Sequence, residues 1–324
     1  MIEIRGLIKI YPGKERYMRA LDDVSLTVAP GECFGLLGLN GAGKTTMLKV
    51  LATLMLPDGG AVTVNGFDVV RQSHQVRSCL GFCSTEADGL YLRLSGEDNL
   101  RFFATLHHVP ESVIRRRSEA LLQFFDLWEA RRKLAKDYST GMKSKLKIAR
   151  ALIHNPPILL LDEPTSGLDY ASALQLYELL QILNKEHGKT ILYTSHHLKE
   201  VEELCQRVGI IHQGRITACG TVDHLKRTLP HPHIVEVKLR SRAPEVINQV
   251  LAGRGVQAIL EESEEVTVAG PLTVLRLQVA DPHQAVDSLA RVLVPSAHLA
   301  GLTILEPGLE DVFIAQTKAA GEVI

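Results

Sequence analysis

The 324-residue sequence contains no long apolar run, and neither sign of charge dominates it. No stretch approaches the roughly 18 uncharged apolar residues that a membrane-spanning helix needs, so we expect no part of the chain to cross a membrane. Lysine and arginine number 36 against 37 acidic residues, a net charge of −1. Without a basic excess the chain is not expected to bind nucleic acid. Short basic runs such as Arg115–Arg117 are typical of solvated helix faces.

Cysteine is also scarce, with five residues that are scattered and form no CxxC pair. This pattern excludes a disulfide framework and is typical of reduced thiols in a cytosolic protein. The first residues alternate apolar and polar side chains, as in a strand, and lack the apolar centre of a signal peptide. With 45% hydrophobic and 23% charged residues, the chain has the composition of a globular protein that buries a core without staples.

Short apolar runs alternate with helical patterns over the first two thirds of the chain. This alternation predicts an α/β core in which parallel strands are joined by helices. The interval from 95 to 153 is helical in pattern and contains no convincing strand. The predicted strands lie within 2–10, 24–28, 33–37, 61–64, 158–161, 190–193 and 208–212.

The pattern changes at Pro230 and Pro232, which predicts two domains, 1–228 and 233–324. The second segment has the order strand, helix, two strands, helix, strand. Such an order is typical of a small α+β domain of the ferredoxin-like type. Its predicted elements are strands 234–239, 266–269, 274–279 and 302–305 and helices 244–251 and 284–294.

The strongest local motif is the run Gly38–Thr45, which fits the spacing G-x-x-x-x-G-K-[ST] of a phosphate-binding loop. It follows a predicted strand and precedes a predicted helix, a context that favours this interpretation over a glycine-rich turn without chemistry. Glycine lets backbone N–H groups approach phosphate oxygens, and the helix dipole favours the same anion. Lys44 is predicted to reach the β- and γ-phosphates and Thr45 to bind Mg²⁺. The predicted nucleotide-binding residues are Gly38, Asn40, Gly41, Ala42, Gly43, Lys44, Thr45 and Thr46.

A second motif begins where the apolar run 158–161 ends in Asp162 and Glu163. A carboxylate at the end of a strand beside the phosphate loop can hold the Mg²⁺ shell, which predicts Asp162 as a metal ligand. The next residue, Glu163, is predicted to orient and polarise the attacking water. The alternative is a solvated acidic turn.

Five motifs together resemble the nucleotide-binding domain of ABC ATPases, in order and spacing, over roughly residues 1–225. They are Gly38–Thr46, Tyr138–Met142, Leu159–Thr165, Ser166–Asp169 and Ser195–His196. The resemblance implies the P-loop NTPase fold of ABC type, with a parallel-sheet core, an N-terminal antiparallel β-subdomain and a helical subdomain near 88–153. It also implies an ATP hydrolase that uses ATP and Mg²⁺.

Further site residues follow from the resemblance alone. It implies that Tyr11 stacks on adenine, with Tyr17 or a purely structural tyrosine as alternatives. It further implies that Ser139 and Gly141 contact the ATP of the opposite subunit, that Asp169 couples the two sites, and that His196 contacts the γ-phosphate. Two subunits would then form a head-to-tail homodimer around two ATP molecules.

Two departures from the family pattern are visible. The Tyr138–Met142 signature, YSTGM, resembles variants found among exporters of the drug- and sodium-efflux type. Thr85 stands where the family has a glutamine that touches Mg²⁺; its hydroxyl could bond the metal's water shell, with a shorter reach.

Two more segments resemble parts of the exporter branch of the family. Leu90–Phe102 resembles the segment that faces the membrane subunit, and Leu309–Phe313 resembles the tail of ATPases that work with ABC-2-type permeases.

These observations predict an ATPase subunit that powers a separately encoded membrane permease, in the export direction, at the cytoplasmic face of the membrane. Glu163 and His196 are the predicted catalytic residues. One alternative is a soluble ABC ATPase without a permease. Another is a regulatory subunit that binds ATP and hydrolyses it poorly, an alternative raised by Thr85. The sequence does not identify the cargo, since the cargo would contact the permease.

Overall fold

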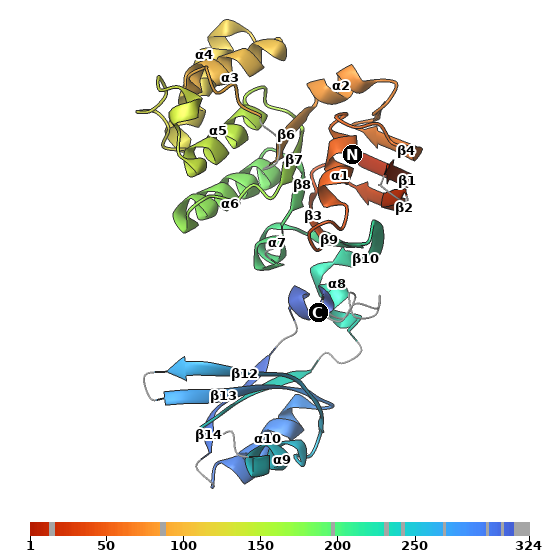
Figure 1. Cartoon of the computed structure of the whole chain (residues 1–324), viewed down its shortest axis with the longest axis vertical. Coiled ribbons are helices and arrows are strands. Elements are labelled where there is room, and N and C mark those ends of the chain that lie inside the picture. Colours follow the sequence, from red (N-terminus) through yellow and green to blue (C-terminus); the bar gives the residue numbers. More distant parts are fainter. Residues whose placement is uncertain are drawn as a thin grey trace. The chain divides into compact units, whose positions relative to one another are not determined.

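The structure, a computed structural model, divides the chain into two compact units, Met1–Val222 and Asp223–Ile324 (Figure 1). The predicted domain boundary lies after this division, beyond helix α8 (Val222–Arg227). No helix in the described part of the chain is long and apolar enough to cross a membrane. The described residues are 1–12, 17–84, 89–195, 198–229, 233–240, 244–267, 270–295, 298–305 and 308–313.

The first unit is built from two sheets and a set of helices. Its strands are β1 (Ile2–Tyr11), β2 (Met18–Val28), β3 (Cys33–Leu37), β4 (Gly59–Val64), β5 (Phe67–Asp68), β6 (Leu80–Ser84), β7 (Ile158–Asp162), β8 (Thr190–Thr194), β9 (Arg207–His212) and β10 (Arg215–Thr221). Its helices are α1 (Lys44–Leu51), α2 (Ser73–Ser78), α3 (Gly96–Leu106), α4 (Glu111–Phe124), α5 (Thr140–Leu152), α6 (Tyr170–Lys185) and α7 (Leu198–Leu204), with a 3₁₀ turn at Ala135–Asp137.

The larger sheet has the strand order β10-β9-β3-β8-β7-β6. Its last five strands run parallel, and β10 pairs antiparallel with β9. Strand β7 reads ILLLD and is buried throughout, as expected for a parallel strand covered on both faces. The smaller sheet, β2-β1-β4-β5, is antiparallel. This is the P-loop ATPase architecture that the sequence predicts, with two strands of the larger sheet, β6 and β10, that the prediction did not include.

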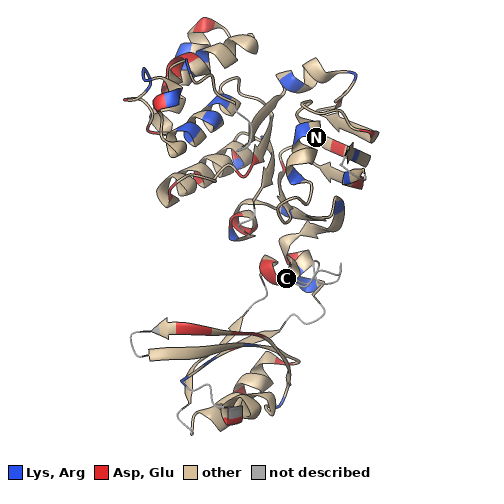
Figure 2. Ribbon diagram, in the orientation of Figure 1, with Lys and Arg blue, Asp and Glu red and all other residues tan. Residues whose placement is uncertain are grey.

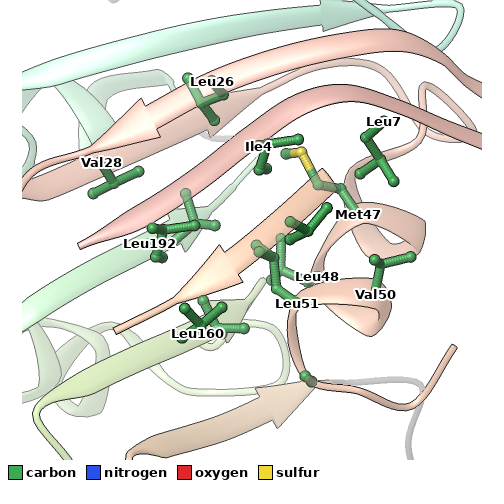
Figure 3. Packing of buried hydrophobic residues seen from close by; sticks show 14 of the residues in the cluster. Ile4, Leu7, Leu26, Val28, Met47, Leu48, Val50, Leu51, Leu160 and Leu192 are labelled. Atoms are coloured by element: carbon green, nitrogen blue, oxygen red, sulfur yellow. The ribbon is translucent and has the colours of Figure 1, made fainter. Parts of the chain in front are cut away.

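Helix α1 packs against residues of both sheets of the first unit (Figure 3). Four of its eight residues are fully buried, namely Met47, Leu48, Val50 and Leu51. They share one core cluster with Ile4 and Leu7 of β1 and with Leu160 of β7. An isolated helix of this length is marginal in water, so this packing must supply most of its stability. The packing thereby fixes the position of the loop that precedes α1.

In the second unit, the described residues between 233 and 305 form one antiparallel sheet and the helices α9 and α10. Its elements follow the predicted order: β11 (Ile234–Leu239), α9 (Pro244–Leu251), β12 (Val256–Thr267), β13 (Gly270–Val279), α10 (Pro282–Leu293) and β14 (Leu299–Leu305). Apolar residues of α9 and α10, such as Val250 and Leu289, share a core cluster with the sheet. The strand order is β12-β13-β11-β14.

Strand β12 begins at Val256, ten residues before the predicted start at 266. Its centre carries four glutamates, Glu261, Glu262, Glu264 and Glu265, which obscure the apolar alternation in the sequence (Figure 2). Because β12 is an edge strand, charges along it discourage pairing with the edge of another sheet.

Candidate nucleotide site

The loop between β3 and α1 needs glycine at two positions for different steric reasons. Gly43 has φ +111°, and a Cβ on it would lie 2.6 Å from the carbonyl oxygen of Ala20. A Cβ on Gly38 would lie 2.5 Å from the carbonyl oxygen of Ile211. Gly41 also has positive φ, +81°, but nothing lies within 4 Å of its Cβ position. The open side at Gly41 leaves room for an anion against the backbone.

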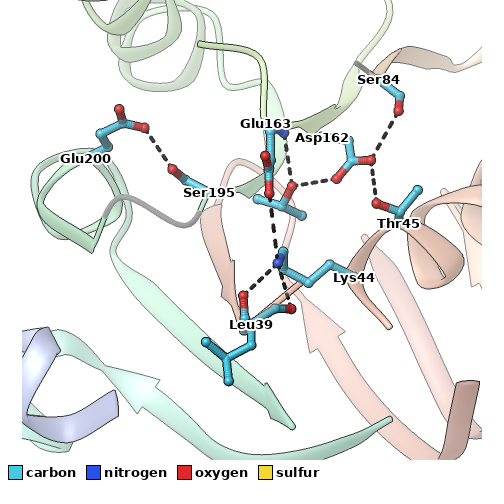
Figure 4. A network of polar contacts seen from close by, with 10 residues as sticks. Leu39, Lys44, Thr45, Ser84, Asp162, Glu163, Ser195 and Glu200 are labelled. Carbon is cyan, nitrogen blue, oxygen red and sulfur yellow. Dashed lines mark hydrogen bonds and ion pairs between the residues drawn. The ribbon is translucent and has the colours of Figure 1, made fainter. Parts of the chain in front are cut away.

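Lys44 begins α1, and its side chain folds back over the loop (Figure 4). Its Nζ donates to the carbonyl oxygens of Gly38, at 2.6 Å, and Leu39, at 3.2 Å. It also lies 3.9 Å from Oε1 of Glu163. Burial lowers the pKa of Lys44, whereas the charges of Glu163 and Asp162 raise it. The loop therefore holds a buried cation beside two carboxylates, where it can meet phosphate oxygens.

Asp162, at the end of β7, is only 2% exposed and accepts three hydroxyl hydrogen bonds. Thr45 Oγ1 and Ser84 Oγ donate to its Oδ2 at 2.8 and 3.1 Å, and Thr194 Oγ1 donates to Oδ1 at 2.7 Å. Such partners are what a buried carboxylate requires.

Two of these partners, Ser84 and Thr194, were not among the predicted site residues. They end strands β6 and β8, which flank β7, and the register pairs both with Asp162. The signal available in the sequence is a hydroxyl residue at the end of each neighbouring apolar strand.

Glu163 adopts a left-handed backbone conformation, φ +48°, which is unusual for a residue with a side chain. Its N–H donates to the carbonyl oxygen and to Oγ1 of Thr194, both at 3.1 Å. These bonds hold a conformation that costs about 1–3 kcal/mol. In this conformation Oε1 of Glu163 lies 3.9 Å from Nζ of Lys44.

The phosphate loop borders a cavity of about 540 Å³. The predicted residues Tyr11, Asn40, Gly41, Gly43, Lys44, Thr45, Thr46, Asp162 and Glu163 line it, together with Met18, Ala20, Leu39 and Lys49. Lys49 adds a second cation that the sequence interpretation did not assign. Gly38 belongs to the loop through its bond from Lys44, and Ala42 is buried in the loop, 6% exposed. The cavity thus combines loop backbone, two cations and two carboxylates.

Tyr11 ends β1 at the rim of this cavity, and its hydroxyl lies 3.1 Å from the sulfur of Met55. The alternative, Tyr17, is 81% exposed and is not among the residues that line the cavity. The geometry therefore favours Tyr11 as the stacking residue.

We predict that Tyr11→Ala will weaken ATP binding by about 5- to 150-fold, because stacking of a base on an aromatic ring contributes about 1–3 kcal/mol. Titration of the protein with a fluorescent ATP analogue measures the effect. Tyr17→Ala is the matched control and should leave the affinity within twofold of wild type. The opposite ranking of the two variants would assign the base contact to Tyr17.

Ser139, Gly141 and Asp169 lie outside this cavity in the same chain. Ser139 caps α5, its Oγ accepting from the N–H of Met142 at 3.2 Å, and Gly141 lies in the first turn of that helix. Asp169 caps α6 by accepting from the N–H of Ser172 at 2.9 Å, a bond that lowers its pKa. Helix N-termini suit anions. The other two predicted residues, Thr85 and His196, lie outside the described residues.

The donor set fits a magnesium ion. Among the described residues, no group of three or more His, Cys, Asp or Glu side chains forms a metal site. Mg²⁺ is usually held by one or two carboxylates or hydroxyls together with substrate phosphates and water, and prefers hard oxygen ligands. The oxygens of Asp162 and Thr45 meet that description, at the edge of the phosphate loop.

The chain resembles proteins of known type along most of its length. Residues 21–166 match the sequence model of the ABC transporter family. The sequence is 40% identical over 225 residues to the ABC transporter ATP-binding protein NatA of Bacillus subtilis (strain 168), covering 69% of this chain and 91% of that protein. It is 36% identical over 318 residues to the daunorubicin resistance ATP-binding protein DrrA3 of Streptomyces coeruleorubidus, a match that covers 98% of this chain and 95% of that protein.

A solved structure with the same fold is the dimeric post-hydrolysis state of the ATP-binding cassette MJ0796, bound to ADP and Pi. It superposes with a TM-score of 0.63 at 26% identity, covering 68% of this chain and 98% of that one.

Proposed function

The chain belongs to the ABC transporter family of ATP-binding proteins, and we propose that its ATPase activity powers a separate membrane permease that exports its cargo. It is an ATP hydrolase of ABC type. The similarity to DrrA3 spans both units of the chain, 98% of its length, and supports the exporter branch. The YSTGM signature at Tyr138–Met142 supports the same branch.

The permease contact is supported by apolar side chains that the first unit exposes. Tyr91 and Leu92 are 50% and 48% exposed, and Leu106 is 58% exposed. Two of these, Tyr91 and Leu92, lie in the segment that resembles the family's membrane-subunit contact. Contiguous exposed apolar groups can mark contact surfaces, and Tyr91 and Leu92 are neighbours in the chain. We place the working position of the chain at the cytoplasmic face of the membrane.

Two copies of the chain are needed for a complete site. The observation that carries this proposal is that Ser139, Gly141 and Asp169 lie at helix N-termini away from the phosphate-loop cavity. In a head-to-tail homodimer, Ser139 and Gly141 of one copy would close over the ATP that the other copy holds. The dimeric state of the MJ0796 cassette supports this arrangement.

Hydrolysis then depends mainly on positioning and charge. Lys44 and the loop N–H groups bind the phosphates, and Glu163 holds the attacking water in line with the γ-phosphate. Asp162 and Thr45 are the residues that would hold Mg²⁺, which neutralises charge on the phosphate oxygens when bound. Closure of two copies on ATP moves the permease, and hydrolysis lets them separate.

The permease proposal predicts retention of the chain on its native membranes. With the chain as bait on detergent-solubilised membranes, we expect mass spectrometry to identify one multi-span permease. Leu92→Ser should reduce that retention by about tenfold or more, because a buried leucine at an interface contributes about 1.5–3 kcal/mol. The ATPase rate of the isolated chain should stay unchanged.

The matched control is Leu260→Ser in β12, a leucine with a similar exposure of 49% in the other unit. It should leave retention unchanged. An equal loss of permease retention in Leu92→Ser and Leu260→Ser would contradict the proposed contact at Leu92. Failure of the wild-type chain to retain any permease would favour the soluble ATPase without a membrane partner.

A further inference from the structure

One carboxylate outside the nucleotide cavity accepts an unusual number of hydroxyl hydrogen bonds. Glu200, on α7, receives Ser195 Oγ at 2.9 Å, Tyr193 OH at 3.0 Å and Thr165 Oγ1 at 3.3 Å, all on the same oxygen, Oε2. The contact to Ser195 is drawn in Figure 4. The Tyr177 hydroxyl also bonds Glu200. Four donors around one carboxylate make an acceptor-centred cluster, which we name the Glu200 cluster.

Two of the donors, Tyr193 and Ser195, are shielded from water, whereas Thr165, Tyr177 and Glu200 are partly exposed. Tyr193 is fully buried and Ser195 is 1% exposed. Burial raises the pKa of both Tyr193 and Tyr177, and the charge of Glu200 raises it further. Both phenols therefore remain protonated donors at any physiological pH. An ionised carboxylate only accepts hydrogen bonds, so it suits a group of hydroxyl donors. A neutral side chain of similar size would accept weaker bonds from the same donors.

The four donors come from the segments that build the catalytic site. Thr165 lies two residues after Glu163 and directly before Ser166–Asp169. Ser195 follows Thr194, which bonds both Asp162 and the N–H of Glu163. Tyr177 lies on α6, the helix that Asp169 caps. Glu200 therefore ties the ends of β7 and β8 and the helix α6 to one point.

Glu200 itself does not line the nucleotide cavity. We propose that Glu200 is a positioning residue for Glu163. Through the Glu200 cluster it holds Thr165, two residues after Glu163, and the residues on both sides of Thr194, so that the Glu163 carboxylate keeps its orientation toward the attacking water. The proposal rests on the proposed role of Glu163 as the residue that positions water. Since the phosphate loop and Lys44 take no part in the cluster, the effect should fall on turnover and leave ATP binding intact.

The test compares Glu200→Gln with wild type in ATP hydrolysis and ATP binding. Glutamine keeps the size of the side chain and removes the charge that makes the hydroxyl bonds strong. We expect kcat to fall by about tenfold, the loss expected for one charge-assisted hydrogen bond. The KM for ATP should stay within twofold. Glu203→Gln, an exposed position on the same helix, is the matched control and should leave kcat unchanged.

The double variant distinguishes the positioning role from a purely structural one. If Glu200 acts through Glu163, adding Glu200→Gln to Glu163→Gln should lower the residual rate by less than about twofold, since residues that act as a unit are non-additive. A tenfold further loss in that background would overturn the proposal, as would a parallel rise in KM with a loss of thermal stability. A wild-type kcat in Glu200→Gln would also overturn it. A wild-type rate in Glu163→Gln would instead remove the proposed role of Glu163.

Single donors provide a gentler test if Glu200→Gln does not fold. Thr165→Val and Tyr177→Phe each remove one hydroxyl and leave the carboxylate in place. Each should lower kcat by about two- to fivefold with unchanged ATP affinity, as expected for one of several bonds to a shared acceptor. Wild-type turnover in both variants would contradict the proposal.

Discussion

Replacing Glu163 with glutamine should lower kcat for ATP hydrolysis by about 10²- to 10⁴-fold, the range expected for loss of a positioned general base. Glutamine preserves the shape of the side chain but cannot accept a proton from the attacking water. ATP affinity should stay close to wild type, because Lys44 and the loop backbone supply the phosphate contacts. Phosphate release under saturating ATP measures the rate, and size-exclusion chromatography should show a dimer that accumulates with ATP.

Glu186→Gln, at the exposed end of α6, is the control for the loss of one glutamate charge and should leave the rate unchanged. A wild-type rate in Glu163→Gln would show that another group activates water. A variant that also loses ATP binding would assign Glu163 to nucleotide affinity rather than to the chemical step.

Replacing Lys44 with alanine should weaken ATP binding by about 100-fold or more, because charge-assisted bonds to phosphate are among the strongest in proteins. Lys44 is 5% exposed and points its ammonium group into the loop, where the carbonyls of Gly38 and Leu39 hold it. In the presence of ATP, phosphate oxygens can replace these carbonyl oxygens as acceptors for Lys44. Equilibrium titration with a fluorescent ATP analogue measures the loss.

Lys49→Ala is the matched control, since Lys49 lines the same cavity from the last turn of α1. Its removal should change the affinity by less than about threefold, because Lys49 is partly exposed and solvent screens its charge. ATP affinity at the wild-type level in Lys44→Ala would contradict the assignment of the phosphate loop. The circular dichroism spectrum of Lys44→Ala should match wild type and so exclude unfolding as the cause.

The sequence predicted the position of those parts of the site that depend on residues close together in the chain. The phosphate loop needs positive φ at Gly41 and Gly43, and only the glycine spacing encodes that. The position of Asp162 follows from the apolar strand before it. The choice between Tyr11 and Tyr17 needed the structure, since the two residues are close in the sequence and only the sheet places Tyr11 beside the cavity. The roles of all the site residues stay predictions, and Thr85 and His196 also lie outside the described residues.

The parts that escaped prediction arise from contacts between distant segments. Ser84 and Thr194 meet Asp162 because three parallel strands end in one row, and strand order is not a local property. The partners of Glu200 come from three elements, and a glutamate on a short helix looks like a solvated residue in the sequence. The prediction missed most of strand β12 because the strand carries glutamates, which an edge strand tolerates and which hide the apolar alternation.

The short helix α1 has a thermodynamic consequence. Its eight residues are ordered by the packing of Met47, Leu48 and Leu51, and the helix N-terminus that meets the phosphate exists only when that packing exists. The unfolded chain therefore has no phosphate site, and folding of the first unit and nucleotide binding are linked equilibria. At a nucleotide concentration of 100 times Kd, this linkage adds about 2.7 kcal/mol to the free energy of unfolding. In a cell with abundant ATP, the nucleotide is a stabilising ligand of the fold as well as the fuel of the cycle.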